Sequence, residues 1–260
     1  MPVFVGLDLA WTATRESGVC VFESAGRDVR LLASTAYVDT PAGFASLCAG
    51  LGADVVVAVD APLIVGPLRL AEREVGRAFS RYQASAHSAS EALLRDSGRM
   101  AGPDLGGELA AREFSLDPHA ITERAPGRFA FECYPHALHV VQFRLIERLP
   151  YKRKKGRRVD FVRGVLQTYQ SLLRGRLEAD LPGLPGQLMD ILDPSAAQAR
   201  GSALKRLEDR LDAVTCAHAA FVAWRDGVQP AEVLGDSHGY VCVPGLAADE
   251  RFAAVRPPVS

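Results

Sequence analysis

The chain has 260 residues, of which 48% are hydrophobic and 23% charged, and its formal net charge is −1. This composition is typical of a globular protein with a sizeable core. The charge excludes a protein-wide basic field, so affinity for nucleic acid must come from a local patch. Five scattered cysteines without a CxxC pair indicate reduced thiols. Residues 1–20 contain no signal-peptide or membrane-span pattern. We expect a cytoplasmic protein without membrane contact, and its oligomeric state stays open.

The first 60 residues alternate between strand and helix patterns. Residues 2–10 predict a strand, and 18–23 and 29–34 predict two further strands that continue it as an antiparallel meander. Thr40-Pro41 is a typical helix start, and the strand that ends at Asp60 follows that helix. This fourth strand is apolar throughout, which indicates burial on both faces and parallel pairing with the first strand.

The remaining 200 residues contain an insertion and then mostly helices. A segment of about 64–127 precedes the next strand pattern, at 128–133, and long insertions of this kind usually carry function. We expect one domain over 1–260, with a basic loop at about 150–158. The other predicted elements are helices over Leu70–Arg81, Ala89–Arg99, His136–Arg148, 160–178 and Ala203–Asp226, and a closing strand over Tyr240–Val243.

Three of the apolar strands end on a lone acid, namely Asp8, Asp60 and Glu132. A carboxylate in such a position is costly to bury unless a cation meets it. Two positions before each acid, on the same face of its strand, lies a small residue: Gly6, Ala58 and Ala130. We expect the last long helix to pack against the sheet at these small residues.

The last long helix supplies a fourth acid. Its apolar stripe runs from Leu204 to Val222, with Asp212 at the edge of the stripe and Asp209 well outside it. Packing along the stripe brings Asp212 against the sheet, and Asp209 either shares the cluster or is solvated. Converging carboxylates need cations, and oxygen ligands favour Mg²⁺ or Mn²⁺. Two such ions can cleave a phosphodiester.

The order of these acids along strands one, four and five and the last helix resembles the ribonuclease H-like superfamily. More closely, the chain resembles the domain of unknown function 429 family, whose members are described as predicted nucleases of that fold. This resemblance implies a mixed five-stranded sheet of order 3-2-1-4-5, helices on both faces, and a metal-dependent nuclease site at Asp8, Asp60, Glu132 and Asp212. The matching stretches are Gly6–Trp11, Val59–Leu63, Arg69–Glu74, Glu132–His136, Tyr151–Lys152 and Asp209–Val214.

Several basic residues are candidates for substrate binding. Lys152 opens a run with six Lys or Arg in seven residues, which is either a solvated loop or a phosphate-binding one. Arg69 and Arg73 begin a ridge of four arginines spaced four residues apart, which is either an exposed face or a lid over a phosphate backbone. His87 and His136 are further candidates near the site. Cys133, His136 and His139 have a zinc-like spacing but lack an apparent fourth ligand.

These features favour a metal-dependent nuclease that acts on DNA or RNA. Two alternatives stay open. One is a phosphotransferase or ATPase of the same superfamily, although 260 residues hardly accommodate the two copies of the fold that such proteins use. The other is a non-catalytic nucleic-acid-binding or scaffold protein.

Overall fold

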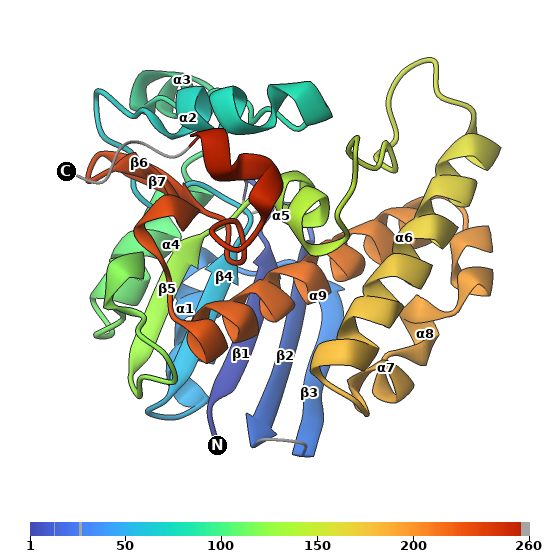
Figure 1. Cartoon of the computed structure of the whole chain (residues 1–260), viewed down its shortest axis with the longest axis horizontal. Helices are drawn as coiled ribbons and strands as arrows, with labels where there is room; N and C mark the ends of the chain where they lie inside the picture. The colour runs from blue at the N-terminus through green and yellow to red at the C-terminus, as the bar shows by residue number, and fades with distance from the viewer. Residues whose placement is uncertain (13, 26–27, 256–260) are drawn as a thin grey trace.

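A mixed five-stranded β-sheet forms the centre of the computed structural model, which describes residues 1–12, 14–25 and 28–255 (Figure 1). The strand order is β3-β2-β1-β4-β5, as expected. β1 pairs antiparallel with β2 and parallel with β4, and β4 pairs parallel with β5. The strands are β1 (Val3–Asp8), β2 (Ser17–Ala25), β3 (Asp28–Tyr37), β4 (Val55–Val59) and β5 (Arg128–Glu132).

Helices cover both faces of this sheet. One core contains the β1 residue Phe4 together with side chains from the long helix α9, and the other contains Val5 with side chains from α1 and α4. This alternation is the period of two of a strand buried on both sides. The helices are α1 (Pro41–Gly50), α2 (Ala71–Phe79), α3 (Glu91–Asp96), α4 (Ala101–Ala110), α5 (Pro135–Gln142), α6 (Val159–Asp180), α7 (Leu184–Gln187), α8 (Met189–Leu192) and α9 (Ser202–Asp226).

The helix start at Thr40-Pro41 is confirmed. The Thr40 hydroxyl accepts a hydrogen bond from the backbone N–H of Gly43 at 3.0 Å, and Pro41 occupies the first turn, where its missing N–H is not needed. Three other predicted helices differ in length: the one at Leu70–Arg81 ends at Phe79 as α2, the one at Ala89–Arg99 is restricted to α3, and α5 ends six residues before Arg148.

The insertion between β4 and β5 is helical, as expected, but one of its helices, α4, was not predicted from the sequence. Its sequence contains Pro103 and three glycines, which are poor helix formers. Two of these glycines permit close packing: a Cβ added at Gly102 would lie 2.3 Å from the carbonyl oxygen of Pro62, and one at Gly106 would lie 2.4 Å from that of Leu63. The segment that follows Asp60 is therefore held directly against α4.

The closing strand does not join the main sheet. β7 (Gly239–Cys242) pairs instead with β6 (Val233–Asp236), which was not predicted, in a separate two-stranded sheet. This hairpin lies against α2 at one end of the molecule (Figure 1). All five cysteines are free thiols. No helix among the described residues is both long enough and apolar enough to cross a membrane.

Candidate metal centre

Parallel pairing of β1 and β4 brings Asp8 and Asp60 together. Leu7 lies opposite Val59, and the backbone N–H of Asp60 donates to the carbonyl of Leu7 at 2.8 Å. The two aspartates thus occupy equivalent positions at the carboxyl ends of neighbouring strands. Alternation places both on the face of the sheet that α9 covers, and both side chains are partly exposed.

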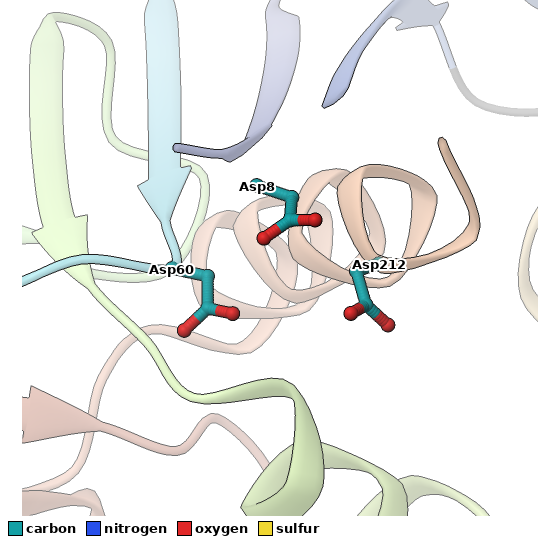
Figure 2. Close-up of side chains that lie close together, drawn as sticks. All are labelled: Asp8, Asp60 and Asp212. Carbon is teal, nitrogen blue, oxygen red and sulfur yellow. The ribbon is translucent and has the colours of Figure 1, made fainter. Parts of the chain in front are cut away.

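Helix α9 adds Asp212 to this pair. The helix lies so close to β1 that a Cβ added at Gly6 would be 1.9 Å from the carbonyl oxygen of Ala213 and 2.2 Å from the backbone nitrogen of Ala217. Asp212, one residue before Ala213, consequently reaches the end of the sheet. One carboxylate oxygen from each of Asp8, Asp60 and Asp212 lies within 4.8 Å of the others (Figure 2).

Asp212 is the most firmly held of the three and is fully buried. Its Oδ1 atom accepts hydrogen bonds from the hydroxyls of Tyr151 at 2.6 Å and Tyr169 at 3.1 Å, while its Oδ2 atom lies 3.0 Å from the Lys152 ammonium. Burial acts to raise the pKa of Asp212, but Lys152 and the hydrogen bond from the Tyr151 hydroxyl lower it below its usual range. Asp212 is therefore a carboxylate with its charge partly compensated.

Asp8 and Asp60 are compensated less well. Burial, reinforced by the neighbouring Asp212, raises the pKa of Asp60 to about 6 although Lys152 opposes the shift. The pKa of Asp8 is raised well above its usual value for the same reasons, with Asp60 adding to the repulsion. The three carboxylates thus carry more negative charge than Lys152 compensates, and Lys205, which also attracts Asp8 and Asp60, is itself paired with Asp209 and Glu208. A cation at this point would relieve the excess of negative charge.

A turn in the basic loop places Lys152 next to the three aspartates. The Arg157 guanidinium donates to the carbonyl oxygens of Pro150 at 3.1 Å and Lys152 at 2.7 Å, which closes the loop on itself. The attraction of the three aspartates outweighs desolvation and raises the pKa of Lys152 well above its usual value. Four other basic residues of the loop are exposed: Arg153, Lys154, Lys155 and Arg158.

A second group of charges lies one turn earlier on α9. Lys205 pairs with Asp209 and, at 3.3 Å, with Glu208. Asp209 is only 3% exposed, contrary to its expected position well outside the packed stripe, because Gly18 of β2 leaves room for the helix. Asp209 nevertheless lies outside the group of three converging carboxylates. Glu208 was not predicted, and only its position four residues before Asp212 could have indicated it.

Glu132 does not join the three aspartates. It lies opposite Val59, one residue short of Asp60, so alternation points it to the same face as Ala130 in the other core. Its Oε1 atom accepts from Arg69 at 2.5 Å, and its Oε2 atom from the backbone of Leu63 at 3.3 Å. The fourfold convergence implied by the resemblance is wrong in this position, as is the expectation that α9 packs at Ala130.

Cys133 takes the place in register with Asp60. Its backbone N–H donates to the carbonyl of Val59 at 2.9 Å, and its thiol lies 3.5 Å from that of Cys216 on α9. A cysteine pair therefore packs where a fourth carboxylate was expected. The zinc grouping of Cys133 with His136 and His139 does not appear among the metal-ligand clusters of the described residues.

The predicted arginine ridge is not continuous. Arg69 precedes the first residue of α2 and its side chain is only 1% exposed, because it donates to Glu132, Glu72 and the carbonyl of Ile64. The Arg69 guanidinium is thus committed to protein partners and does not face solvent, where the substrate-binding prediction requires it. Arg73 is exposed on α2.

The two predicted histidines have different environments. His87 is exposed and lines a small pocket beside Asp60. His136 is buried, with its ring centroid 5.4 Å from that of Tyr151, and its neighbour His139 lies 5.7 Å from the same ring. Burial lowers the pKa of His136 well below 6.5 and that of His139 to about 4. Both are therefore neutral at pH 7 and support Tyr151 beneath Asp212.

A family model described as "Protein of unknown function (DUF429)" matches residues 6–233. The chain belongs to this family. The match begins at Gly6, includes Asp8, Asp60, Lys152 and Asp212, and extends beyond the end of α9. No curated protein and no solved structure matches the chain.

The donor set of this DUF429 protein fits a hard divalent cation. Asp8, Asp60 and Asp212 offer carboxylate oxygens only, which is the ligand type of Mg²⁺ and Mn²⁺ rather than of zinc in a thiolate or imidazole site. Lys152 supplies the compensating charge next to Asp212. The residues present therefore fit the metal expected from the sequence, with three carboxylates in place of four.

In metal-free protein, Asp60→Asn is expected to become progressively more stabilising as the pH rises from about 4 to about 6. The pKa of Asp60 is about 6 in the folded protein, whereas an unfolded aspartate has a pKa of ~3.9. The native wild type retains this proton longer than the unfolded chain, so its stability falls as pH rises through this window, and asparagine removes that loss. Urea unfolding of both proteins in EDTA at several pH values measures the difference. A difference that does not change with pH would contradict the raised pKa.

Proposed function

We propose that this DUF429 protein is a divalent-metal-dependent phosphodiesterase that cleaves nucleic acid. The observation that carries the proposal is the convergence of Asp8, Asp60 and Asp212 within 4.8 Å at the carboxyl ends of two parallel strands. Such an edge of an open α/β sheet is a common place for ligands. The observed strand order, with α9 packed across β1, is also the arrangement that a ribonuclease H-like fold implies, and it supports the same reading.

The chain's own residues have distinct roles in this proposal. Asp8 and Asp60 hold the metal with their partly exposed carboxylates, and Asp212 completes the set from the helix. Tyr151 and Tyr169 fix the orientation of the Asp212 carboxylate through its Oδ1 atom. Lys152 lies between the acids and the solvent-exposed loop, where its ammonium can meet a phosphate oxygen. A bound divalent cation supplies an activated water and stabilises the leaving oxygen.

The exposed basic loop favours a polyanionic substrate over a small phosphate ester. Arg153, Lys154, Lys155 and Arg158 extend from Lys152 and are exposed, in a protein whose overall charge is −1. A local cationic patch of this kind next to a carboxylate cluster attracts the phosphate backbone while the metal engages one phosphate.

A substrate panel tests the proposal. Purified protein is incubated with end-labelled single-stranded DNA, duplex DNA, RNA and branched DNA in Mn²⁺, Mg²⁺ or EDTA, beside Asp8→Asn purified in the same way. Cleavage of at least one substrate by the wild type, lost in EDTA and in Asp8→Asn, is expected. Equal cleavage by the variant would identify a contaminant and refute the proposal. Hydrolysis of ATP without any cleavage of nucleic acid would favour a phosphotransferase or ATPase.

A further inference from the structure

A second recess adjoins the carboxylate cluster and shares Asp60 with it. It is a shallow recess with a cavity volume of about 60 Å³, and the surrounding space amounts to about 420 Å³ when open solvent at its mouth is included. Its lining comes from the carboxyl ends of the parallel strands β1, β4 and β5 and the segments that follow them, from the insertion, and from Val241 of β7. The side chains that give it chemical character are Trp11, Asp60, Glu72, His87, Glu132 and Tyr134.

The composition of this recess separates it from the phosphate-binding side of the site. Three of the side chains that line it are aromatic, and three carry a carboxylate. The aromatic ones are Trp11, His87 and Tyr134, and the acidic ones are Asp60, Glu72 and Glu132. Among the described residues that line it there is no lysine and no arginine. The nearby Arg69 is 1% exposed and already pairs with Glu72 and Glu132. The three carboxylates disfavour a phosphate group here, and the Arg99 guanidinium, 5.6 Å from the centroid of the Trp11 ring, covers one face of that ring. A flat ligand that donates hydrogen bonds would find stacking surfaces and acceptors.

Glu72 provides the acceptor that is most available. Its Oε1 atom accepts a hydrogen bond from the Nε–H of Arg69 at 2.7 Å. Within the described part of the chain, no group donates a hydrogen bond to its Oε2 atom. The side chain is 18% exposed. Both oxygens of Glu132, in contrast, are occupied by Arg69 and the backbone of Leu63. One carboxylate oxygen therefore remains free at the wall of the recess.

The aromatic wall on the insertion side is held in place. The Tyr134 hydroxyl donates to the carbonyl oxygen of Ser85 at 3.1 Å, which ties the segment that carries His87 to the end of β5. A recess with fixed walls can select its ligand by shape, because little ordering is required on binding.

We propose that this recess receives an amine-bearing nucleobase, from an unpaired nucleotide next to the phosphate at the carboxylate cluster. Stacking on the rings of Trp11, His87 or Tyr134 holds the base, and the free oxygen of Glu72 accepts from its exocyclic amine, as acidic side chains accept from cytosine. A base inside a duplex cannot enter such a recess. The inference rests on the proposed function and adds a preference for single-stranded substrates with cytosine, adenine or guanine at that position.

Nucleotide binding tests this inference without relying on turnover. Calorimetry in Mg²⁺ compares cytidine monophosphate, uridine monophosphate and ribose phosphate, which contain no phosphodiester. Cytidine monophosphate is expected to bind roughly tenfold more tightly than ribose phosphate, since a stacked base adds that order of affinity. Trp11→Ala removes most of this gain. Glu72→Gln removes the preference for cytidine over uridine, because its amide can also donate to the uracil carbonyl.

Controls distinguish a lost base site from a damaged fold. Glu147→Gln alters an exposed glutamate that bonds to no other described residue, and should bind all three ligands as wild type does. Trp11→Phe keeps an aromatic wall and should restore most of the base-dependent affinity if Trp11→Ala is poorly folded. Thermal melting of each variant reports on folding separately.

The outcomes separate this inference from the proposed function. Equal metal-dependent binding of all three ligands would overturn the nucleobase recess and leave the phosphate site intact. Absence of binding by all three would also overturn it. Base-dependent binding, sensitive to Trp11→Ala, in a protein that cleaves no nucleic acid would support the recess and refute the nuclease.

Discussion

Asp60→Asn is expected to reduce metal-dependent cleavage by roughly a thousandfold, because several kcal/mol of transition-state stabilisation depend on the metal that Asp60 helps to hold. The substitution should not destabilise the folded protein. In the structure, burial and the neighbouring Asp212 disfavour the ionised form of Asp60 and raise its pKa to about 6. Replacing it by a neutral amide of the same shape relieves that repulsion in metal-free protein.

Activity and stability should therefore move in opposite directions. Single-turnover cleavage measures the first, and thermal melting with and without Mn²⁺ measures the second. Mn²⁺ should raise the melting temperature of the wild type through binding to the native state and should do so much less in Asp60→Asn. Asp212→Asn is a less informative variant, because it also alters the partners of Tyr151, Tyr169 and Lys152.

Asp96→Asn is the matched control. Asp96 is exposed at the end of α3 and forms no ion pair with another described residue, so both activity and the response to Mn²⁺ should be unchanged. Full activity of Asp60→Asn, or equal stabilisation of both variants by Mn²⁺, would show that the three aspartates do not form the metal centre.

Gly6→Ala is expected to destabilise the protein by more than about 3 kcal/mol or to prevent folding, because overpacking against rigid backbone cannot be relieved by a change of rotamer. The added Cβ would lie 1.9 Å from the carbonyl oxygen of Ala213 and 2.2 Å from the nitrogen of Ala217. Both atoms belong to the backbone of α9, so the whole helix would have to move away from β1.

The displacement of α9 would also separate the carboxylates. Asp212 immediately precedes Ala213, so a folded Gly6→Ala protein should have lost its response to Mn²⁺ as well as stability. Gly18→Ala provides a second variant, because its Cβ would lie 2.1 Å from the backbone oxygen of Asp209. Urea denaturation followed by circular dichroism measures these effects.

Gly164→Ala is the control for the substitution itself. Gly164 lies in α6 with no atom within 4 Å of an added Cβ, so alanine should stabilise the helix by ~0.5–1 kcal/mol. If Gly6→Ala were as stable as the wild type, α9 would not pack on β1 as described.

Local patterns in the sequence were sufficient for much of the fold. Apolar runs without polar alternation identify β1 and β4, and Thr40-Pro41 identifies the start of α1, because these signals depend on neighbours along the chain. The segments α4 and β6 were missed since their stability comes from contacts with distant segments. Gly102 and Gly106 are unfavourable in an isolated helix and favourable only against the carbonyl groups of Pro62 and Leu63.

The same distinction between local patterns and distant contacts applies to the candidate site. The sequence by itself determined that Asp8 and Asp60 end buried strands and that Asp212 lies at the edge of an apolar helical stripe. Only the tertiary structure decided which acids meet. Glu132 lies opposite Val59 and not opposite Asp60, and this shift of one residue points its side chain to the other face of the sheet. There it forms an ion pair with Arg69. Likewise, among the described basic residues of the loop, only Lys152 forms an ion pair with Asp212, next to the Tyr151 hydroxyl. Register arises from pairing between distant strands, and the place of Lys152 depends on its contact with Asp212, 60 residues away, so no local pattern encodes either.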